Sequence, residues 1–285
     1  MAHAPHTVEP TPPHREPKKD SRHGRLAFRL QPPIASSARS GLQTFDGGDG
    51  TQVGMAYVPS GLADSPFRVV VLLHGSGGSA RQGIELMLPI ADRHRFLLLA
   101  PRSQWATWDV IVRGFGPDVR QIDRLLGEVS AMWPVDRLAV GGFSDGASYA
   151  LSLGIANGDL FDSVVAFSPG FAASMIAHGA PRLFISHGIN DEVLPINDCS
   201  RRLVPRLERA GYSVTYVEFD GAHAVPAELL EQAGTWLATA PRQRQDPVDQ
   251  APGAPHSDLS KGLTGGVGAG GDGGPTYRNR PCSPR

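Results

Sequence analysis

The stretch GGFSDGASYA, residues 141–150, decides the fold. It contains the pattern G-x-S-x-G at residues 142–146, after the strand-like RLAVG and before the helix-like ASYALSLGIA. A strand, a sharp turn and a helix in this order form a nucleophile elbow, which holds a serine in a strained conformation with its Oγ above the sheet. An ordinary glycine-rich turn is the alternative, and the flanking strand and helix disfavour it. Ser144 is therefore the candidate nucleophile.

Two later loops supply the partners that such a serine needs. A serine hydroxyl becomes an effective nucleophile only when an adjacent base takes its proton. Behind a nucleophile elbow the acid and then the histidine follow in chain order, each after a later strand. The strand-like RLFIS precedes HGINDEVLP, which contains Asp191, and VTYVEFD precedes GAHAVP, which contains His223. The sequence thus predicts a catalytic triad of Ser144, Asp191 and His223.

Other acids and histidines compete for these roles. Asp220 adjoins the histidine instead of occupying the preceding loop, and Glu192 is a substitute acid beside Asp191. Asp162 precedes a strand, which places it at the opposite edge of the sheet. His187 is expected to be a structural, hydrogen-bonded histidine near the site, and His178 to lie on the surface. No His, Asp and Glu group has the spacing of metal ligands, so no metal is predicted.

Strand-like and helix-like segments alternate along the middle of the chain. The apolar runs FRVVVLLH and FLLLAP are typical of strands buried on both faces. The alternation predicts one α/β domain with a mostly parallel sheet and helices on both faces, and the first two strands are expected to form an antiparallel edge hairpin around FDGGDG. The expected strands are 25–30, 52–58, 68–74, 95–100, 137–141, 163–168, 182–187 and 213–219, and the expected helices are 79–93, 117–132, 145–157, 197–210 and 226–238.

Composition indicates which parts of the chain are ordered, which partners are expected and where the protein is located. Residues 1–24 and 241–285 are rich in Pro, Gly and polar residues, so both are expected to be disordered around a catalytic domain at 25–240. The formal charge of -1 gives no general attraction to nucleic acid. No secretory signal or membrane-length apolar run is visible, and the two distant cysteines need no oxidising compartment. A cytoplasmic protein without membrane insertion is expected, and the oligomeric state stays open.

Residues 72–80, LLHGSGGSA, also fit the dinucleotide-binding spacing G-x-G-x-x-G/A. Such a fold needs an acidic residue at the end of the next strand, about 20 residues onward. Here RFLLLAPRS ends in Ala-Pro-Arg instead. No nucleotide or other cofactor is predicted.

Five stretches together resemble a known family: LLHGSGGSA, GFSDGASYALSLG, FSPGF, HGINDEVLP and GAHAVP. They are similar to the α/β-hydrolase superfamily, and more narrowly to the predicted esterase branch of the phospholipase/carboxylesterase family. The resemblance implies the α/β-hydrolase fold, the same triad, and an oxyanion loop opened by His74-Gly75. One oxyanion donor would be the N–H of Ser76 or of neighbouring Gly77, and the other that of Asp145. Ser76 stands where relatives of the acyl-protein thioesterase type often carry an apolar residue, so their substrate is not carried over.

The sequence says less about the substrate. Only about a dozen residues separate the strands at 163–168 and 182–187, which leaves no room for a large cap domain. An uncapped site predicts small or medium acyl esters, with thioesters a further option. Candidate pocket walls are Trp105, Trp108, Phe115, Phe171 and Leu194, although the tryptophans fit a packing role equally well. A peptidase on the same fold and a non-catalytic binding protein are the alternatives, and a dienelactone hydrolase is disfavoured because its nucleophile is cysteine.

Overall fold

The computed structural model describes residues 21–31, 39–60, 66–174 and 176–239 of the 285-residue chain. Most of both predicted disordered ends lies outside these ranges. Residues 21–24 are described, and Ser21–His23 form a short 3-10 turn. None of the described helices is long and apolar enough to span a membrane.

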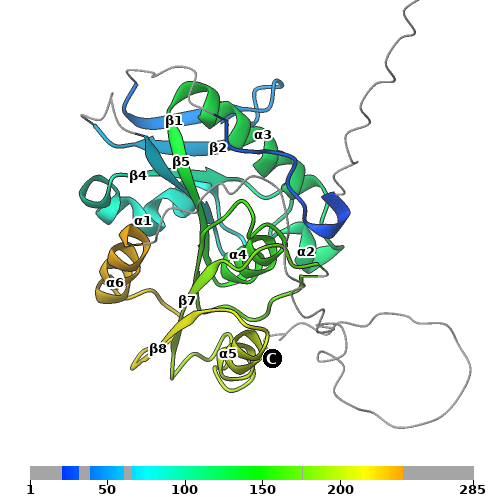
Figure 1. Cartoon of the computed structure of the whole chain (residues 1–285), viewed down its shortest axis with the longest axis vertical. Coiled ribbons are helices and arrows are strands. Elements are labelled where there is room, and N and C mark those ends of the chain that lie inside the picture. Colours follow the sequence, from blue (N-terminus) through cyan, green and yellow to red (C-terminus); the bar gives the residue numbers. More distant parts are fainter. Residues whose placement is uncertain (1–20, 32–38, 61–65, 175, 240–285) are drawn as a thin grey trace, which may run out of the picture.

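A single eight-stranded sheet forms the centre, with the order β1-β2-β4-β3-β5-β6-β7-β8 (Figure 1). β2 pairs antiparallel with both β1 and β4, and the other pairs are parallel. The mostly parallel sheet predicted from the alternating pattern is therefore confirmed. The strands are β1 (Gly41–Asp46), β2 (Gln52–Val58), β3 (Phe67–Leu73), β4 (Phe96–Pro101), β5 (Val135–Phe143), β6 (Ser163–Phe167), β7 (Arg182–Gly188) and β8 (Val214–Phe219).

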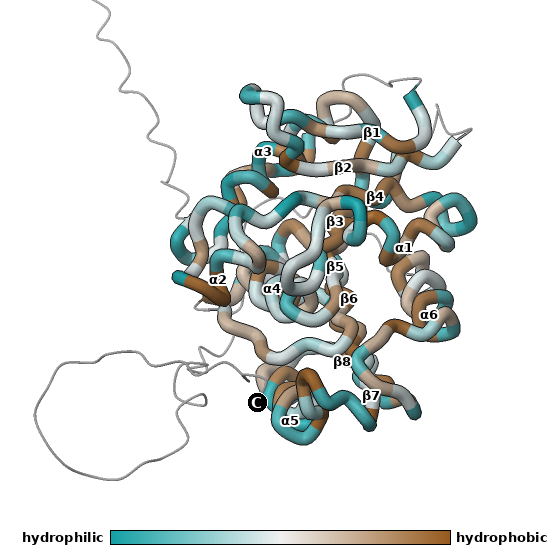
Figure 2. The backbone as a smooth tube through the Cα atoms, turned by 180° about the vertical axis from the view of Figure 1, so that it is seen from behind, coloured by the Kyte–Doolittle hydropathy of each residue, from teal (hydrophilic) through white to brown (hydrophobic). Residues whose placement is uncertain are grey.

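Helices cover both faces of this sheet. α1 (Ala80–His94) and α6 (Ala227–Ala238) pack on one face, while α3 (Pro117–Met132), α4 (Asp145–Ala156) and α5 (Ser200–Arg209) pack on the other. Alternate residues of a strand point to opposite faces, so Val69 and Val71 enter one core while Val70 and Leu72 enter the other. This explains the unbroken apolar run of β3. The central strands form the brown, hydrophobic middle of Figure 2.

Two elements were not predicted correctly. The hairpin around the glycine-rich turn exists, but its first strand is β1, at Gly41–Asp46, and not residues 25–30. Only Phe45 of β1 is buried, so the apolar signal of this strand is weak. A one-turn helix, α2 (Asp109–Val112), was also missed.

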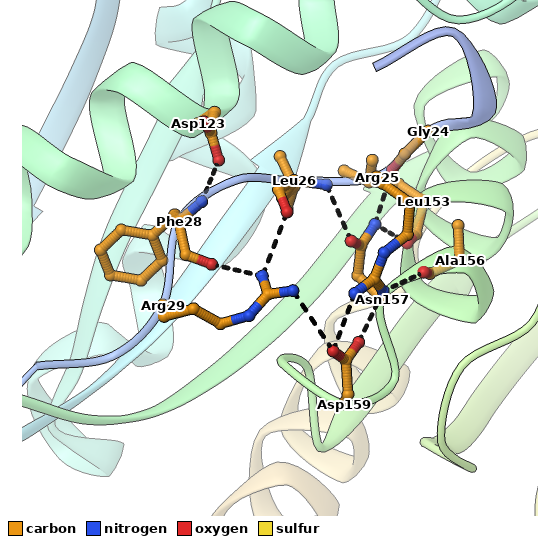
Figure 3. Close-up of polar contacts among 10 residues, drawn as sticks. All are labelled: Gly24, Arg25, Leu26, Phe28, Arg29, Asp123, Leu153, Ala156, Asn157 and Asp159. Atoms are coloured by element: carbon orange, nitrogen blue, oxygen red, sulfur yellow. Dashed lines mark hydrogen bonds and ion pairs between the residues drawn. The ribbon is translucent and has the colours of Figure 1, made fainter. Parts of the chain in front are cut away.

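Residues 24–30 form an extended segment, the N-terminal strap, that lies along α3 and the end of α4 (Figure 3). The Leu26 N–H donates to Asn157 Oδ1 (2.9 Å), and the Phe28 N–H donates to Asp123 Oδ1 (2.5 Å). Arg25 forms two hydrogen bonds to the Asp159 carboxylate, at 2.7 and 2.9 Å. Because side chains satisfy these backbone groups, the segment needs no strand partner.

Candidate active site

Ser144 occupies the sharp turn between β5 and α4. Its φ of 58° is unusual for a residue with a side chain and marks a strained backbone. The Ser144 N–H donates to the Phe167 carbonyl of β6 (3.0 Å), and the Ser144 carbonyl accepts the N–H groups of Ala147 and Ser148 at 3.0 and 3.1 Å. The strained turn is therefore held by the neighbouring strand on one side and by the first turn of α4 on the other.

The two glycines of the motif are explained by close backbone approach. A Cβ at Gly142 would lie 2.5 Å from the Gly146 carbonyl group, and a Cβ at Gly146 would lie 2.0 Å from the Leu73 carbonyl oxygen. No side chain fits at either position without moving backbone. The spacing of the motif thus reflects the packing of α4 between β5 and the end of β3.

Ser144, His223 and Asp191 form one chain of hydrogen bonds. Ser144 Oγ lies 2.9 Å from His223 Nε2, and His223 Nδ1 lies 2.6 Å from Asp191 Oδ2. The other carboxylate oxygen, Oδ1, accepts the N–H groups of Val193 and Leu194 at 2.9 and 2.8 Å. With Nδ1–H donating to the acid, Nε2 is left to accept the serine proton. The structure brings together the three side chains that the sequence singled out.

The acid and histidine loops are held side by side. Asn190 Nδ2 donates to Asp220 Oδ1 (2.9 Å), and the Ile189 N–H donates to the Phe219 carbonyl (2.9 Å). Gly188 is required here, since a Cβ would lie 2.4 Å from the carbonyls of Gly221 and Ala222. These contacts hold the loop that contains Asp191 beside the loop that contains His223.

The competing acids and histidines are not members of the hydrogen-bonded chain of Ser144, His223 and Asp191. Asp220 and Glu192 are exposed, as is His178, which was expected at the surface. Asp162 forms a buried ion pair with Arg68 (2.5 Å) before β6 begins, away from the carboxyl edge of the sheet. His187 is buried and hydrogen-bonded beside Asp191.

The loop after β3, whose Gly75 lies beside Ser144, contains a backbone N–H without a partner among the described residues. The Gly78 N–H donates to the Gly75 carbonyl (3.0 Å), and Gly77 has a φ of 71°, as in a type II turn. The Gly77 N–H already donates to the Ala106 carbonyl (2.6 Å), whereas the Ser76 N–H donates to no described residue. The same holds for the Asp145 N–H at the first turn of α4. Of the three predicted oxyanion donors, the N–H groups of Ser76 and Asp145 thus have no partner among the described residues, whereas that of Gly77 has one.

Trp108 supports this loop and does not line a pocket. Its ring is fully buried between His74 and Tyr149, with centroids 4.7 and 5.1 Å away, so no substrate can contact it. Its indole N–H donates to the His74 carbonyl (2.8 Å). The expectation of Trp108 as a wall residue is therefore wrong, and the packing alternative holds.

His74 itself is a neutral, positioned side chain. Its Nδ1 lies 2.8 Å from the Gly75 carbonyl, while Nε2 accepts the Ser103 N–H (3.3 Å), which assigns the proton to Nδ1. Burial lowers the pKa of His74. Its ring thus fixes the first peptide of the loop after β3.

The other wall candidates differ in exposure. Trp105 is 41% exposed, and the Arg113 guanidinium lies 5.6 Å from its ring centroid. Phe171 is partly buried, and Leu194 is buried beside Gly170. Phe115 is buried against Tyr149 and the strap, so it faces the core.

The segment after β6 is bound to α4 by two serines that the sequence reading missed. The Gly170 N–H donates to Ser148 Oγ (2.9 Å), and the Ala173 N–H donates to Ser152 Oγ (2.8 Å). The sequence did contain a signal for these two serines, because residues 144, 148 and 152 lie four apart and therefore on one helix face. The described part of residues 168–181 contains no helix, in agreement with an uncapped site.

Within the described residues, no group of three or more His, Cys, Asp or Glu side chains is arranged to hold a metal ion.

Comparison with known proteins identifies relatives of this architecture. Residues 113–240, which include Ser144, Asp191 and His223, match the family model described as Phospholipase/Carboxylesterase. The crystal structure of esterase PE8 is similar with a TM-score of 0.54 at 22% identity, over 66% of this chain and 98% of that one. A carboxylesterase of Bacillus cereus gives 0.52 at 21% identity, over 65% and 93%. FphF, a fluorophosphonate-binding serine hydrolase of Staphylococcus aureus, gives 0.56 at 16% identity, over 69% and 97%.

No curated protein sequence matches the chain. At these identities the structural likeness establishes the fold.

Proposed function

From its α/β-hydrolase fold and its match to the phospholipase/carboxylesterase family, we propose that this chain hydrolyses carboxylic esters through an acyl-enzyme on Ser144. The observation that carries the proposal is the chain of hydrogen bonds from Ser144 Oγ through His223 to Asp191. A nucleophile, its base and the group that orients the base are present in hydrogen-bonding reach.

The reaction runs in two steps. His223 Nε2 takes the proton of Ser144 as Oγ attacks the ester carbonyl, and Asp191 stabilises the resulting imidazolium. The N–H groups of Ser76 and Asp145 stabilise the oxyanion; one such donor is worth about 3 kcal/mol in related chemistry. His223 then gives its proton to the leaving alcohol. Water, activated by the same imidazole, releases the acid and restores the serine.

The substrate class follows from what surrounds the serine. With only a short segment between β6 and β7, the site is open to small or medium acyl groups, thioesters included. Trp105, Phe171 and Leu194 are the apolar side chains proposed to contact the substrate. The cytoplasmic location expected from the sequence stays a prediction.

The proposal is tested with Ser144→Ala. The variant should keep the fold, because the hydroxyl is the only group removed, and should lose hydrolysis of p-nitrophenyl acetate. Turnover that survives in the folded variant contradicts the assignment. Faster cleavage of aminoacyl anilides than of esters by the wild type would indicate a peptidase.

A further inference from the structure

His187, at the end of β7, makes contacts that the triad alone does not explain. Its Nε2 lies 2.8 Å from the Leu194 carbonyl and 3.3 Å from Asp191 Oδ2, the oxygen that also receives His223 Nδ1. Its Nδ1 lies 2.6 Å from Ser200 Oγ at the start of α5. The side chains of both His187 and Asp191 are fully buried.

These partners determine where the proton of His187 lies. The Leu194 carbonyl and the Asp191 carboxylate can only accept, so Nε2 must carry the hydrogen. Ser200 Oγ then donates to Nδ1, since a hydroxyl can do either. The opposite tautomer would set a lone pair against two acceptors in a buried site, which is strongly unfavourable. His187 therefore donates its Nε2–H to the Leu194 carbonyl (2.8 Å), and this N–H group lies 3.3 Å from Asp191 Oδ2.

On the basis of the proposed function, we propose that His187, oriented by Ser200, is a positioning residue that fixes the Asp191 carboxylate and the Leu194 segment in one geometry. The order of contacts is Ser200, His187, Asp191, His223 and Ser144. The same N–H reaches the main chain of Leu194, a proposed pocket wall. One ring thereby contacts both the acid and the segment that carries the wall, in addition to the Val193 and Leu194 N–H groups that hold Asp191 Oδ1.

The His187 N–H also bears on how strongly the Asp191 charge acts on His223. The charged and titratable groups around His187 are Asp191, His223 and Glu218. Burial lowers the pKa of His187, so the ring stays neutral and acts as a donor, not as a cation. The positive end of its N–H group, 3.3 Å from Asp191 Oδ2, would offset part of the carboxylate charge that acts on His223. Without it, the carboxylate would stabilise the His223 imidazolium more strongly, and the acid limb of the pH–rate profile would move to higher pH.

The test compares three substitutions in the full-length protein. His187→Leu removes the donor, and His187→Gln keeps one N–H and one acceptor. Phe184→Leu removes buried volume from the same strand without touching the triad, and so serves as the stability control. Each protein is assayed with p-nitrophenyl acetate across the acid limb, and its melting temperature is measured.

We expect His187→Leu to lower kcat by about tenfold or more, with KM little changed and the acid limb at higher pH. His187→Gln should restore the wild-type limb and most of kcat, and Phe184→Leu should lose stability without moving the limb. A folded His187→Leu protein with the wild-type kcat and limb overturns the proposal. Equal losses in the Leu and Gln variants also overturn it, because they indicate packing alone.

If His187→Leu does not fold, Ser200→Ala carries the test. This variant frees the ring, so the acid limb should shift in the same direction by a smaller amount, and an unchanged profile overturns the proposal. Failure of the wild type to hydrolyse esters or to react with a fluorophosphonate would instead overturn the proposed function. The two failures are thus distinguishable.

Discussion

At the scale of single residues, the site depends on Gly142, Gly146 and Gly188, because a Cβ at any of them would overlap a neighbouring carbonyl group. The motif G-x-S-x-G identified Ser144 because strand and helix context around it is visible in sequence. The sequence could not show that the Gly77 N–H already has a partner, since this depends on a hydrogen bond from Gly77 to Ala106, a residue of a different loop. The buried position of Trp108 was equally hidden, because a tryptophan after a strand fits either a wall or a core.

Gly146→Ala tests the packing at the elbow. We expect a loss of at least about 1–3 kcal/mol in the free energy of unfolding, because the new methyl group would overlap the Leu73 carbonyl. Gly127→Ala in α3 is the matched control: a Cβ there meets nothing within 4 Å, and alanine favours the helix by up to about 1 kcal/mol. Urea unfolding measures both. Equal stability changes in the two variants would refute the packing explanation.

At the scale of elements, the loop between β4 and α3 is held by two buried carboxylates. Asp118 Oδ1 and Oδ2 accept the N–H groups of Gln104 and Asp109 at 2.9 and 2.8 Å. Asp109 Oδ2 accepts those of Gly116 and Asp118 at 2.8 and 2.9 Å. The pair therefore orders the loop that contains Trp105 and Trp108. Its role could not be predicted, because both acids look like ordinary helix-start residues in the sequence.

This pair predicts a pH dependence of stability. Burial, and then the charge of Asp109, raise the pKa of Asp118 from 3.8 to about 6. The folded state therefore binds this proton more tightly than the unfolded state does. The contribution of Asp118 to stability should rise as pH falls from above 6 toward 3.8, by up to ~3 kcal/mol.

Asp109→Asn isolates the charge effect. The amide keeps an oxygen for the Gly116 and Asp118 N–H groups but removes the negative charge beside Asp118. Urea unfolding at several pH values should then show a smaller, but not absent, gain between pH about 7 and about 5, since burial remains. A gain as large as that of the wild type would contradict this role of Asp109.

At the scale of the whole molecule, the strap joins the start of the chain to helices far along it. Asn157 is its centre: Nδ2 donates to the carbonyls of Gly24 (2.7 Å) and Leu153 (2.8 Å), and Oδ1 accepts from Leu26 (Figure 3). The mostly parallel sheet and most helices were predictable from the alternation and periodicity of apolar segments, which are local. The strap was mistaken for a strand because its partners, Asn157 and Asp123, are about a hundred residues away in sequence.

Asn157→Ala should lower the free energy of unfolding by roughly 1–3 kcal/mol or more, because it leaves buried backbone groups of the strap unpartnered. Arg29→Ala removes a half-exposed ion pair with Asp159 and should cost less than about 1 kcal/mol. The kcat for ester hydrolysis should stay near wild type in both, since neither residue contacts the triad. Thermal unfolding beside a standard ester assay measures this. A large loss of kcat in a stably folded Asn157→Ala protein would show that the strap acts on the site itself.

The central claim is that Ser144 is an activated nucleophile. Its most direct test is reaction of the full-length protein with a fluorophosphonate, followed by peptide mass mapping, beside Ser144→Ala as the control. The account predicts one adduct, on Ser144, which is absent from the variant. No adduct on folded wild-type protein, or an adduct on another residue, would contradict it.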